Sequence, residues 1–417
     1  MHQAASNTTV GPQRAAADAA TSRAYRLTAI DALRGLAIII MAIDHVRDFF
    51  LVGTDMDPMA NPNVSAGLFA TRWITHLCAP VFVLLAGTSA GLMTARKSRS
   101  ELARFLFTRG LWLIVVEMFV IATAWTFSPG GIVEFGGLTW TSMQVIWAIG
   151  ASMVVLSGLQ WLGRSACFAL GVAVIAGHNL LDPIWPASQL FDRQWPVWVA
   201  LHSTMSLPAG PFLFGFRYPL LPWIGVMLLG FGISGVFELP RARRNAILLG
   251  AGAGLTLGFL LLRASGIYGD PNPWQVQPYG MTATVIDFLN LTKYPPSLLF
   301  LTMTLGPAAI LCALVDRVSG GVLGLVKDAL AMFGRVPFAF YVAHLYLIHL
   351  LSVLLGLSQG FSLGQMMTSS RFYPKGFGVD LPEVFVVWVL VVALLYPFCR
   401  WVAGVKARRR DWWLSFV

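Results

Sequence analysis

The sequence predicts an all-α fold, specifically a polytopic integral membrane bundle of about ten transmembrane helices. Hydrophobic residues make up 57% of the chain and charged residues only 12%, whereas a soluble domain carries about 25% charged residues. The apolar residues gather in runs long enough to cross a bilayer as helices. These runs are continuous and do not alternate with polar residues, so the pattern does not favour a β-barrel.

Each apolar run predicts one membrane span, and three stretches fall outside this pattern. Residues 1–25 are rich in Ala, Ser and Thr without an apolar core, which predicts a disordered cytoplasmic tail and no signal peptide. Residues 406–417 form a basic C-terminal tail, and 194–217 is apolar but contains three prolines, which leaves a re-entrant or interfacial segment open. The predicted spans are 30–51, 70–94, 105–127, 140–162, 165–181, 219–238, 245–263, 295–316, 331–357 and 383–404.

The basic residues predict the orientation. One set of loops holds seventeen Lys and Arg residues, and the other holds five. Because cytoplasmic loops carry the excess of Lys and Arg, both termini are expected in the cytoplasm. The net charge of +10 therefore reflects membrane topology, and no nucleic-acid partner is expected.

Cysteine and histidine spacing predicts no metal site. The four cysteines each fall within a predicted span, and none forms a CxxC pair. No helix carries two histidines at ligand spacing, and no G-x-S-x-G nucleophile elbow occurs.

Three histidines within the spans are candidate catalytic residues, because ionisable groups are costly in a membrane. His45 closes the first span, His76 opens the second and His344 lies near the middle of the ninth, all in the outer half by this topology. Asp48, at i+3 from His45, shares its helix face and would orient the ring of a general base. The alternatives are a charge-neutralising packing network for His45, an interfacial role for His76 and interhelical hydrogen bonding for His344.

Four arginines lie just inside the cytoplasmic ends of spans, namely Arg34, Arg109, Arg335 and Arg400. Guanidinium groups suit phosphate, so together they predict a site for a phosphate-rich ligand entering from the cytoplasm. Snorkelling to lipid headgroups is the alternative for each of them singly. Arg34 and His45 are eleven residues apart, about 16 Å along a helix, so one helix would join the two groups of residues.

Five blocks of the chain carry a family resemblance: Arg26–His45, Trp73–Ala90, Tyr218–Met227, Lys293–Pro307 and Phe333–His349. Together they resemble bacterial membrane proteins similar to heparan-alpha-glucosaminide N-acetyltransferase. The spacing Arg34-x10-His45 is also similar to that of acyltransferase family 3, in which this histidine is taken as the catalytic base and the arginine as structural or cofactor-related. The lysosomal animal enzymes have asparagine at the position of His45 and a catalytic histidine in the next loop, whereas Leu51–Leu68 here contains none.

The resemblance implies that residues 26–405 form one transmembrane acyltransferase domain in the bacterial cytoplasmic (inner) membrane. Acetyl-CoA or another acyl-CoA would enter from the cytoplasm, and the acyl group would pass to a hydroxyl or amine of an extracytoplasmic sugar or glycan. His45 would be the base, with Asp48, His76 and His344 around it, and the four arginines would bind CoA. A transporter or permease for a small solute and a non-catalytic scaffold are the rival readings, and a homodimer is left open.

Overall fold

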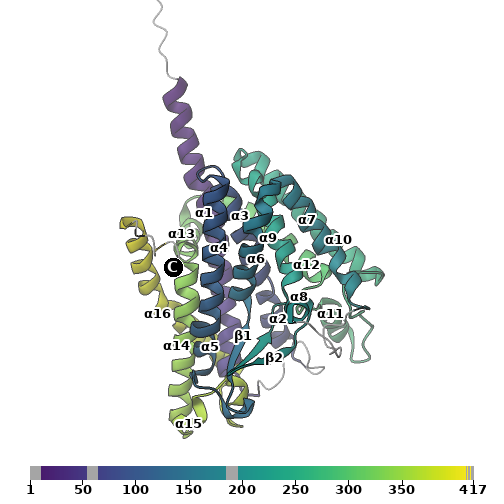
Figure 1. Ribbon diagram of the computed structural model, residues 1–417, viewed down its shortest axis with the longest axis vertical. Helices are drawn as coiled ribbons and strands as arrows, with labels where there is room; N and C mark the ends of the chain where they lie inside the picture. The colour runs from purple at the N-terminus through teal and green to yellow at the C-terminus, as the bar shows by residue number, and fades with distance from the viewer. Residues whose placement is uncertain (1–10, 54–63, 185–195, 410, 412–413, 415–417) are drawn as a thin grey trace, which may run out of the picture.

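The protein is described here from a computed structural model that covers residues 11–53, 64–184, 196–409, 411 and 414. Within these residues the chain folds into a bundle of long, roughly aligned helices with one small sheet at its end (Figure 1). Nine helical segments of the described chain are long and apolar enough to cross a membrane. They are Ala66–Met93, Arg99–Thr126, Val145–Leu162, Arg164–Leu181, Leu220–Glu238, Arg241–Ser265, Leu298–Arg317, Pro337–Ser358 and Leu381–Arg408.

These segments are built from consecutive helical elements. Some of the segments end in a 3-10 turn, and the segment Arg99–Thr126 contains a π turn. The elements are α2 (Ala66–Thr75), α3 (Cys78–Met93), α4 (Arg99–Val116), η1 (Glu117–Ile121), α5 (Ala122–Thr126), α6 (Val145–Leu159), η3 (Gln160–Leu162), α7 (Arg164–Gly177), η4 (His178–Leu181), α9 (Leu220–Ile233), η5 (Ser234–Glu238), α10 (Arg241–Ser265), α12 (Leu298–Arg317), α14 (Pro337–Ser358) and α16 (Leu381–Arg408). The all-α prediction is therefore confirmed for the bundle.

Helix α1 (Gly11–Phe50) corresponds to the first predicted span, although it is not among these nine. Asp44, Arg47 and Asp48 interrupt its apolar stretch, and a charged stretch of this kind needs partners inside the protein. It finds them, because α1 packs against α2, α3, α12, α14 and α16, and also against α13 (Gly321–Arg335). The histidine-bearing part of α1 is thus at the centre of the bundle.

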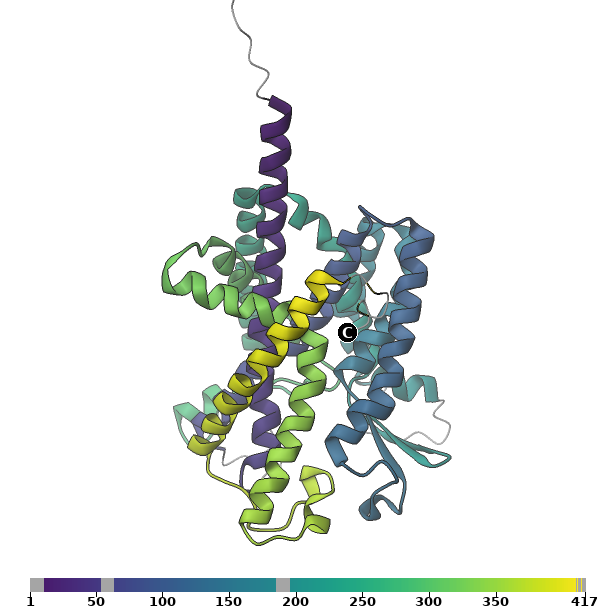
Figure 2. The ribbon, with the colours of Figure 1, turned by 90° about the vertical axis from the view of Figure 1, so that its left-hand side faces the viewer.

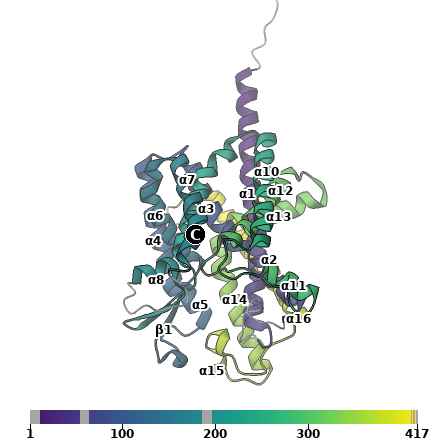
Figure 3. The same ribbon diagram turned by 90° about the vertical axis from the view of Figure 1, so that its right-hand side faces the viewer.

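The first turns of α1 project beyond the other helices (Figures 1 and 3). Residues 11–25, which composition predicted to be a disordered tail, belong to this helix. Their many alanines have high helix propensity, which is enough to continue a helix that is already nucleated by a packed span. Residues 1–10 lie outside the described part.

The predicted ninth span, 331–357, is in fact two helices. α13 (Gly321–Arg335) ends before Val336, and α14 begins at Pro337, which occupies its first position. Proline fits there because its missing N–H has no partner in a first turn. Figure 2 shows α13 lying across α1 rather than along it. The break therefore places Arg335 at a corner between two helices.

The crossing of α1 and α13 requires glycine on both sides. A Cβ atom on Gly35 would overlap the backbone carbonyl of Leu330, and one on Gly334 would overlap the carbonyl of Asp31. Small residues at such a crossing let two backbones come close, as is common in membrane helices. This contact fixes the end of α13 beside the middle of α1.

The segment 194–217 was left open as a re-entrant or interfacial segment, and its described residues form neither a span nor a long helix. They form α8 (Pro196–His202) and a hairpin of β2 (Ser206–Ala209) and β3 (Phe212–Phe216). β3 also pairs in parallel with β1 (Thr139–Met143), which gives the order β1-β3-β2. The predicted fourth span at 140–162 thus starts too early, since its first residues are a strand and α6 begins at Val145.

The remaining elements are short and lie in loops. They are η2 (Val133–Phe135), α11 (Met281–Leu289), α15 (Leu363–Met366) and η6 (Ser370–Phe372). In Figure 1 the strands and α15 lie at the end of the bundle opposite to the start of α1. The C-terminal part of α16 returns towards the end where α1 begins (Figure 2).

Candidate functional site

Two of the predicted histidines contact each other directly. His45 on α1 and His344 on α14 are joined by a 2.6 Å contact between Nδ1 of His45 and Nε2 of His344. Their rings are stacked, with centroids 4.9 Å apart. His344 is fully buried and His45 is partly exposed. The packing of α1 against α14 therefore forms a histidine pair, meaning His45 with His344, from residues 299 positions apart.

The partners of this histidine pair determine its neutral tautomers. Nδ1 of His344 lies 2.6 Å from the carbonyl oxygen of Tyr341 and 3.1 Å from that of Phe340. Carbonyl oxygens only accept, so this nitrogen carries the proton and Nε2 of neutral His344 must accept from Nδ1–H of His45. In the neutral pair, Nε2 of His45 then keeps a free lone pair, which is the form that a general base requires.

Aromatic rings surround His45. The ring of Trp125 packs edge-on against it, with centroids 5.2 Å apart, and the ring of Tyr341 lies 6.2 Å away. Nε2 of His45 makes no hydrogen bond to another residue of the described chain. The ring is thus held through one nitrogen and by packing, while the other nitrogen is left for a ligand.

The prediction that Asp48 orients His45 is wrong. Asp48 accepts a 2.7 Å hydrogen bond from Arg47, and the orienting contact on His45 comes from His344. The same guanidinium donates at 2.7 Å to Asp44, which lies three residues before it on α1. Sharing a helix face did not decide the partner, because an adjacent guanidinium is a stronger partner for a carboxylate than a neutral imidazole.

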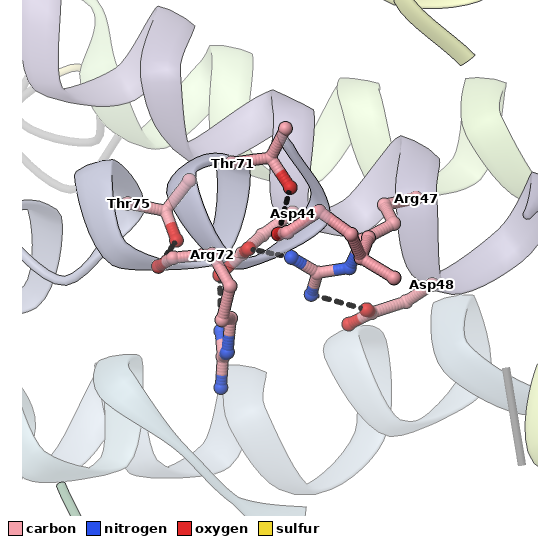
Figure 4. A network of polar contacts seen from close by, with 7 residues as sticks. Asp44, Arg47, Asp48, Thr71, Arg72 and Thr75 are labelled. Atoms are coloured by element: carbon pink, nitrogen blue, oxygen red, sulfur yellow. Dashed lines mark hydrogen bonds and ion pairs between the residues drawn. The ribbon is translucent and has the colours of Figure 1, made fainter. Parts of the chain in front are cut away.

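A buried ion network lies next to the histidine pair on α1 (Figure 4). Asp44 binds both Arg47 of its own helix and Arg72 of α2. Arg72 is 8% exposed, and sequence reasoning missed it. Buried charges must be paired, so this network fixes α2 against α1 and compensates the charges that made α1 an unusual span.

His76 occupies the break between α2 and α3. Its side chain is 1% exposed, and neither ring nitrogen has a hydrogen-bond partner in the described chain. The ring packs with its centroid 5.1 Å from that of Phe300, and within the described chain no hydrogen bond or ring contact joins it to the histidine pair. His76 is therefore buried near α12 and does not take part in the hydrogen bonding of His45.

A second feature is a cavity of about 570 Å³ bounded by α1, α3, α4, α6 and the α13–α14 corner. Its size suits a ligand site, for which about 300–1,000 Å³ is usual. None of its described lining residues is a carboxylic acid, and five are cations, which define the cationic cavity: Arg34, Lys97, Arg109, Arg335 and Lys406. The rest of the wall is largely apolar, with Ile38, Phe82, Phe105, Leu106, Ile146 and Ile149 among its side chains.

Three of the four predicted arginines line this cavity, and the fourth does not. Arg400 lies on an exposed face of α16 and is absent from the lining. Lys406 lines the cavity instead, from the last turns of α16, and Lys97 does so from the turn before α4. The sequence placed Lys406 in a tail, although the continuing helical period of α16 would have shown that the helix extends past it.

Arg34 is held rigidly at the cavity wall. Its guanidinium donates to the carboxylate of Asp31, three residues before it on α1, at 3.0 Å, and to the hydroxyl of Ser89 at 3.1 Å. A third bond of 3.2 Å reaches the carbonyl of Gly334. The last bond depends on the close α1–α13 crossing, so the glycine contact also fixes the cation.

The cationic cavity reaches the histidine pair through Tyr341. This residue lines the cavity and packs against both histidines, with ring centroids 6.2 Å from His45 and 5.4 Å from His344. Tyr341 thus links the cations of the cavity wall to the candidate base.

Glu117, directly after the end of α4, is a buried acid that the sequence analysis did not select. It begins the π turn η1, and its carboxylate accepts a 2.9 Å bond from the N–H of Trp147, with the N–H groups of Gln144 and Ile146 nearby. A carboxylate at the positive end of a helix is favourable. Glu117 therefore caps α6, one wall of the cationic cavity.

The described residues contain no group of three or more His, Cys, Asp or Glu side chains able to hold a metal.

The family model for the catalytic region of heparan-alpha-glucosaminide N-acetyltransferase matches residues 26–259, which is more than half of the chain. The chain belongs to this acetyltransferase family. A search of curated proteins finds no match.

Family membership makes the protein a multi-pass membrane transferase of the acetyltransferase type. The matched region contains His45, His76, Arg34 and Arg109. It ends before α13 and α14, so the assignment of Arg335, Tyr341 and His344 to the site rests on the geometry described above.

Proposed function

We propose that the protein transfers an acetyl or other short acyl group from cytoplasmic acyl-CoA to a hydroxyl or amine of an extracytoplasmic sugar or glycan. The observation that carries the proposal is the continuity of the cationic cavity with the histidine pair at Tyr341. CoA has phosphates at one end and a thioester at the other, which matches a cavity with cations at its mouth and a base beyond its far wall.

The cations would bind the CoA phosphates. Five guanidinium or ammonium groups line the cavity, and charge-assisted hydrogen bonds to phosphate are among the strongest in proteins. Arg34 already shares its charge with Asp31, so its main part would be to hold a fixed donor geometry. The apolar wall of α4 and α6 would contact the uncharged arm of CoA and exclude water around the thioester.

His45 would act as the general base. Its Nε2 accepts the proton of the acceptor hydroxyl or amine, and the acceptor atom attacks the thioester carbon. His344 would be a positioning residue, since its Nε2 accepts from Nδ1 of His45 and so selects the tautomer with a free Nε2. His76 lies deeper against Phe300, and we assign it to the surroundings of the acceptor rather than to proton transfer.

The location follows from the same reasoning. The basic loops predict that the end of the bundle where α1 begins faces the cytoplasm, and the cationic cavity would then open to that side. A cytoplasmic (inner) bacterial membrane would supply acyl-CoA on one face and glycan on the other.

The test is direct acyl transfer by the purified full-length protein. In detergent or proteoliposomes, radiolabelled acetyl-CoA should label one or more members of a panel of amino sugars and hydroxylated sugars. CoA thioesters should also raise the melting temperature, because a ligand at one hundred times its Kd stabilises the native state by about 2.7 kcal/mol. A transporter or a scaffold predicts neither result, and absence of both would refute the proposal.

A further inference from the structure

Tyr341 lies where the donor cavity meets the candidate base. It precedes His344 by three residues on α14, so both side chains lie on one helix face. The residue is 4% exposed, and it belongs to the wall of the cationic cavity. Its ring packs against both members of the histidine pair, at 6.2 Å and 5.4 Å between centroids.

The hydroxyl of Tyr341 makes no hydrogen bond to another residue of the described chain. Other tyrosines of the protein do: the hydroxyl of Tyr346 donates to the carbonyl of Val120 at 2.9 Å, and that of Tyr373 contacts the Ser352 hydroxyl at 2.8 Å. The Tyr341 oxygen is not among the enclosed polar atoms that lack a partner, so it is accessible from the cavity. Its position on a cavity wall means that a ligand can supply the missing acceptor.

The other donors around the cavity are already engaged or are charged. Ser89 is the one other uncharged polar side chain among the described lining residues, and its hydroxyl donates to the carbonyl of Leu85 at 2.7 Å. The N-terminal N–H groups of α6, which could otherwise have stabilised an anion, face the carboxylate of Glu117. Beside the histidine pair, two neutral donors are not committed, the hydroxyl of Tyr341 and the indole N–H of Trp125. Of these two residues, Tyr341 is the one among the described residues that line the cavity.

We propose that the hydroxyl of Tyr341 donates a hydrogen bond to the carbonyl oxygen of the acyl-CoA thioester and stabilises the oxyanion that forms there. This assignment rests on the proposed acyl transfer and adds the group that would activate its electrophile. In the first step the acceptor oxygen or nitrogen bonds to the carbonyl carbon, its proton passes to Nε2 of His45, and the carbonyl electron pair moves onto oxygen.

In the second step the oxyanion collapses, the carbon–sulfur bond breaks, and the CoA thiolate takes the proton from Nε2 of His45. The products are acylated acceptor and free CoA thiol, so atoms and charges balance. Tyr341 keeps its proton throughout and contributes through the hydrogen bond alone. A neutral donor in a water-poor site is effective because it is already oriented when the charge develops.

The experiment compares Tyr341→Phe with Tyr346→Phe in the full-length purified protein. Both variants remove one hydroxyl from the same helix, but only Tyr341 lies on the cavity wall. Tyr341→Phe should lower kcat about 10²–10³-fold, as loss of an oxyanion donor does. CoA affinity and melting temperature should stay close to those of the wild type, and Tyr346→Phe should keep near-normal kcat.

A second measurement keeps the proposal testable if the phenylalanine variant is unstable. A difluorotyrosine at position 341 keeps the hydroxyl but ionises at lower pH than tyrosine. Because the ionised form cannot donate, kcat should fall at a lower pH than in the wild type. A wild-type rate for Tyr341→Phe, or an unchanged pH profile with difluorotyrosine, would overturn the role of Tyr341 while leaving acyl transfer intact. Failure of the wild type to transfer acyl groups would instead refute the proposed function itself.

Discussion

Substitution of the histidine pair tests the proposed chemistry most directly. His45→Gln keeps a polar side chain of similar size but removes the proton-accepting nitrogen, because an amide is not basic. A general base contributes about 10²–10⁴-fold, and each factor of ten is about 1.4 kcal/mol of activation free energy. Removal of His45 should therefore raise the barrier by about 2.7–5.5 kcal/mol.

The structure also predicts how His344 should behave. His344 is fully buried and is not among the described residues of the cavity wall, so it should affect proton transfer through its 2.6 Å contact with His45. His344→Gln should lower kcat by at least about tenfold, and by less than His45→Gln does. Since both changes act on one group, the double variant should be no slower than His45→Gln alone.

The assay is single-turnover acyl transfer with saturating acyl-CoA, with CoA affinity measured separately by calorimetry. CoA affinity should be unchanged in all three variants, because neither histidine is among the described residues that line the cationic cavity. The reasoning would be refuted if the rate of His45→Gln stayed within about threefold of the wild-type rate, because loss of a general base should lower the rate by at least about 10²-fold. It would also fail if the effects of the two single changes multiplied, since that would mean that His344 acts independently.

Three further predictions concern the cations, the helix crossing and the topology. Arg335→Gln and Lys406→Gln should each weaken CoA binding by about tenfold or more, since a hydrogen bond to a charged group is worth about 1.5–3 kcal/mol. Arg400→Gln, outside the cavity, should leave CoA affinity unchanged. Calorimetry would measure the three affinities, and equal CoA affinities for all three variants would leave snorkelling as the role of these cations. Gly334→Ala should lower the melting temperature and CoA affinity, because the new Cβ would overlap the Asp31 carbonyl. Gly254→Ala, with open space around its Cβ, should be neutral or stabilising. A Gly334→Ala variant with unchanged melting temperature and CoA affinity would contradict the close contact between α1 and α13. The four native cysteines are buried, so a thiol reagent that cannot cross the membrane should report only on an introduced cysteine. In intact cells it should label the exposed Pro273→Cys, on the outer side of the proposed topology, but not the exposed Ala95→Cys, on the cytoplasmic side. The reverse pattern would invert the proposed orientation.

The sequence by itself determined the class of the protein and much of its site. Apolar run length is a local property, and it predicted the membrane helices because the hydrogen-bonding demand of a bilayer leaves few other structures. The charges of α1 identified its functional importance for the same reason, since Arg34 and His45 are costly in a membrane helix. The i−3 pair of Asp31 with Arg34 was also predictable, because helix geometry determines which near neighbours meet.

The tertiary structure decided which residues meet across helices. Hydropathy does not distinguish a lipid-facing side from a protein-facing side, because lipid tails are as apolar as a packed interior. It therefore could not show that Arg400 faces outward while Lys406 reaches the cavity. The break at Val336 and the β-hairpin were missed because an apolar run is compatible with a helix, a strand or a corner.

The partner of His45 was the most consequential of these decisions. Spacing along α1 favoured Asp48, but a guanidinium took that carboxylate, and packing brought His344 to Nδ1 of His45 from 299 residues away. Periodicity reports which residues share a face of one helix, whereas the hydrogen-bond partner across two helices depends on their crossing and rotation. The sequence therefore determined that His45 is a costly imidazole in a membrane helix, and only the fold decided which of its nitrogens is free.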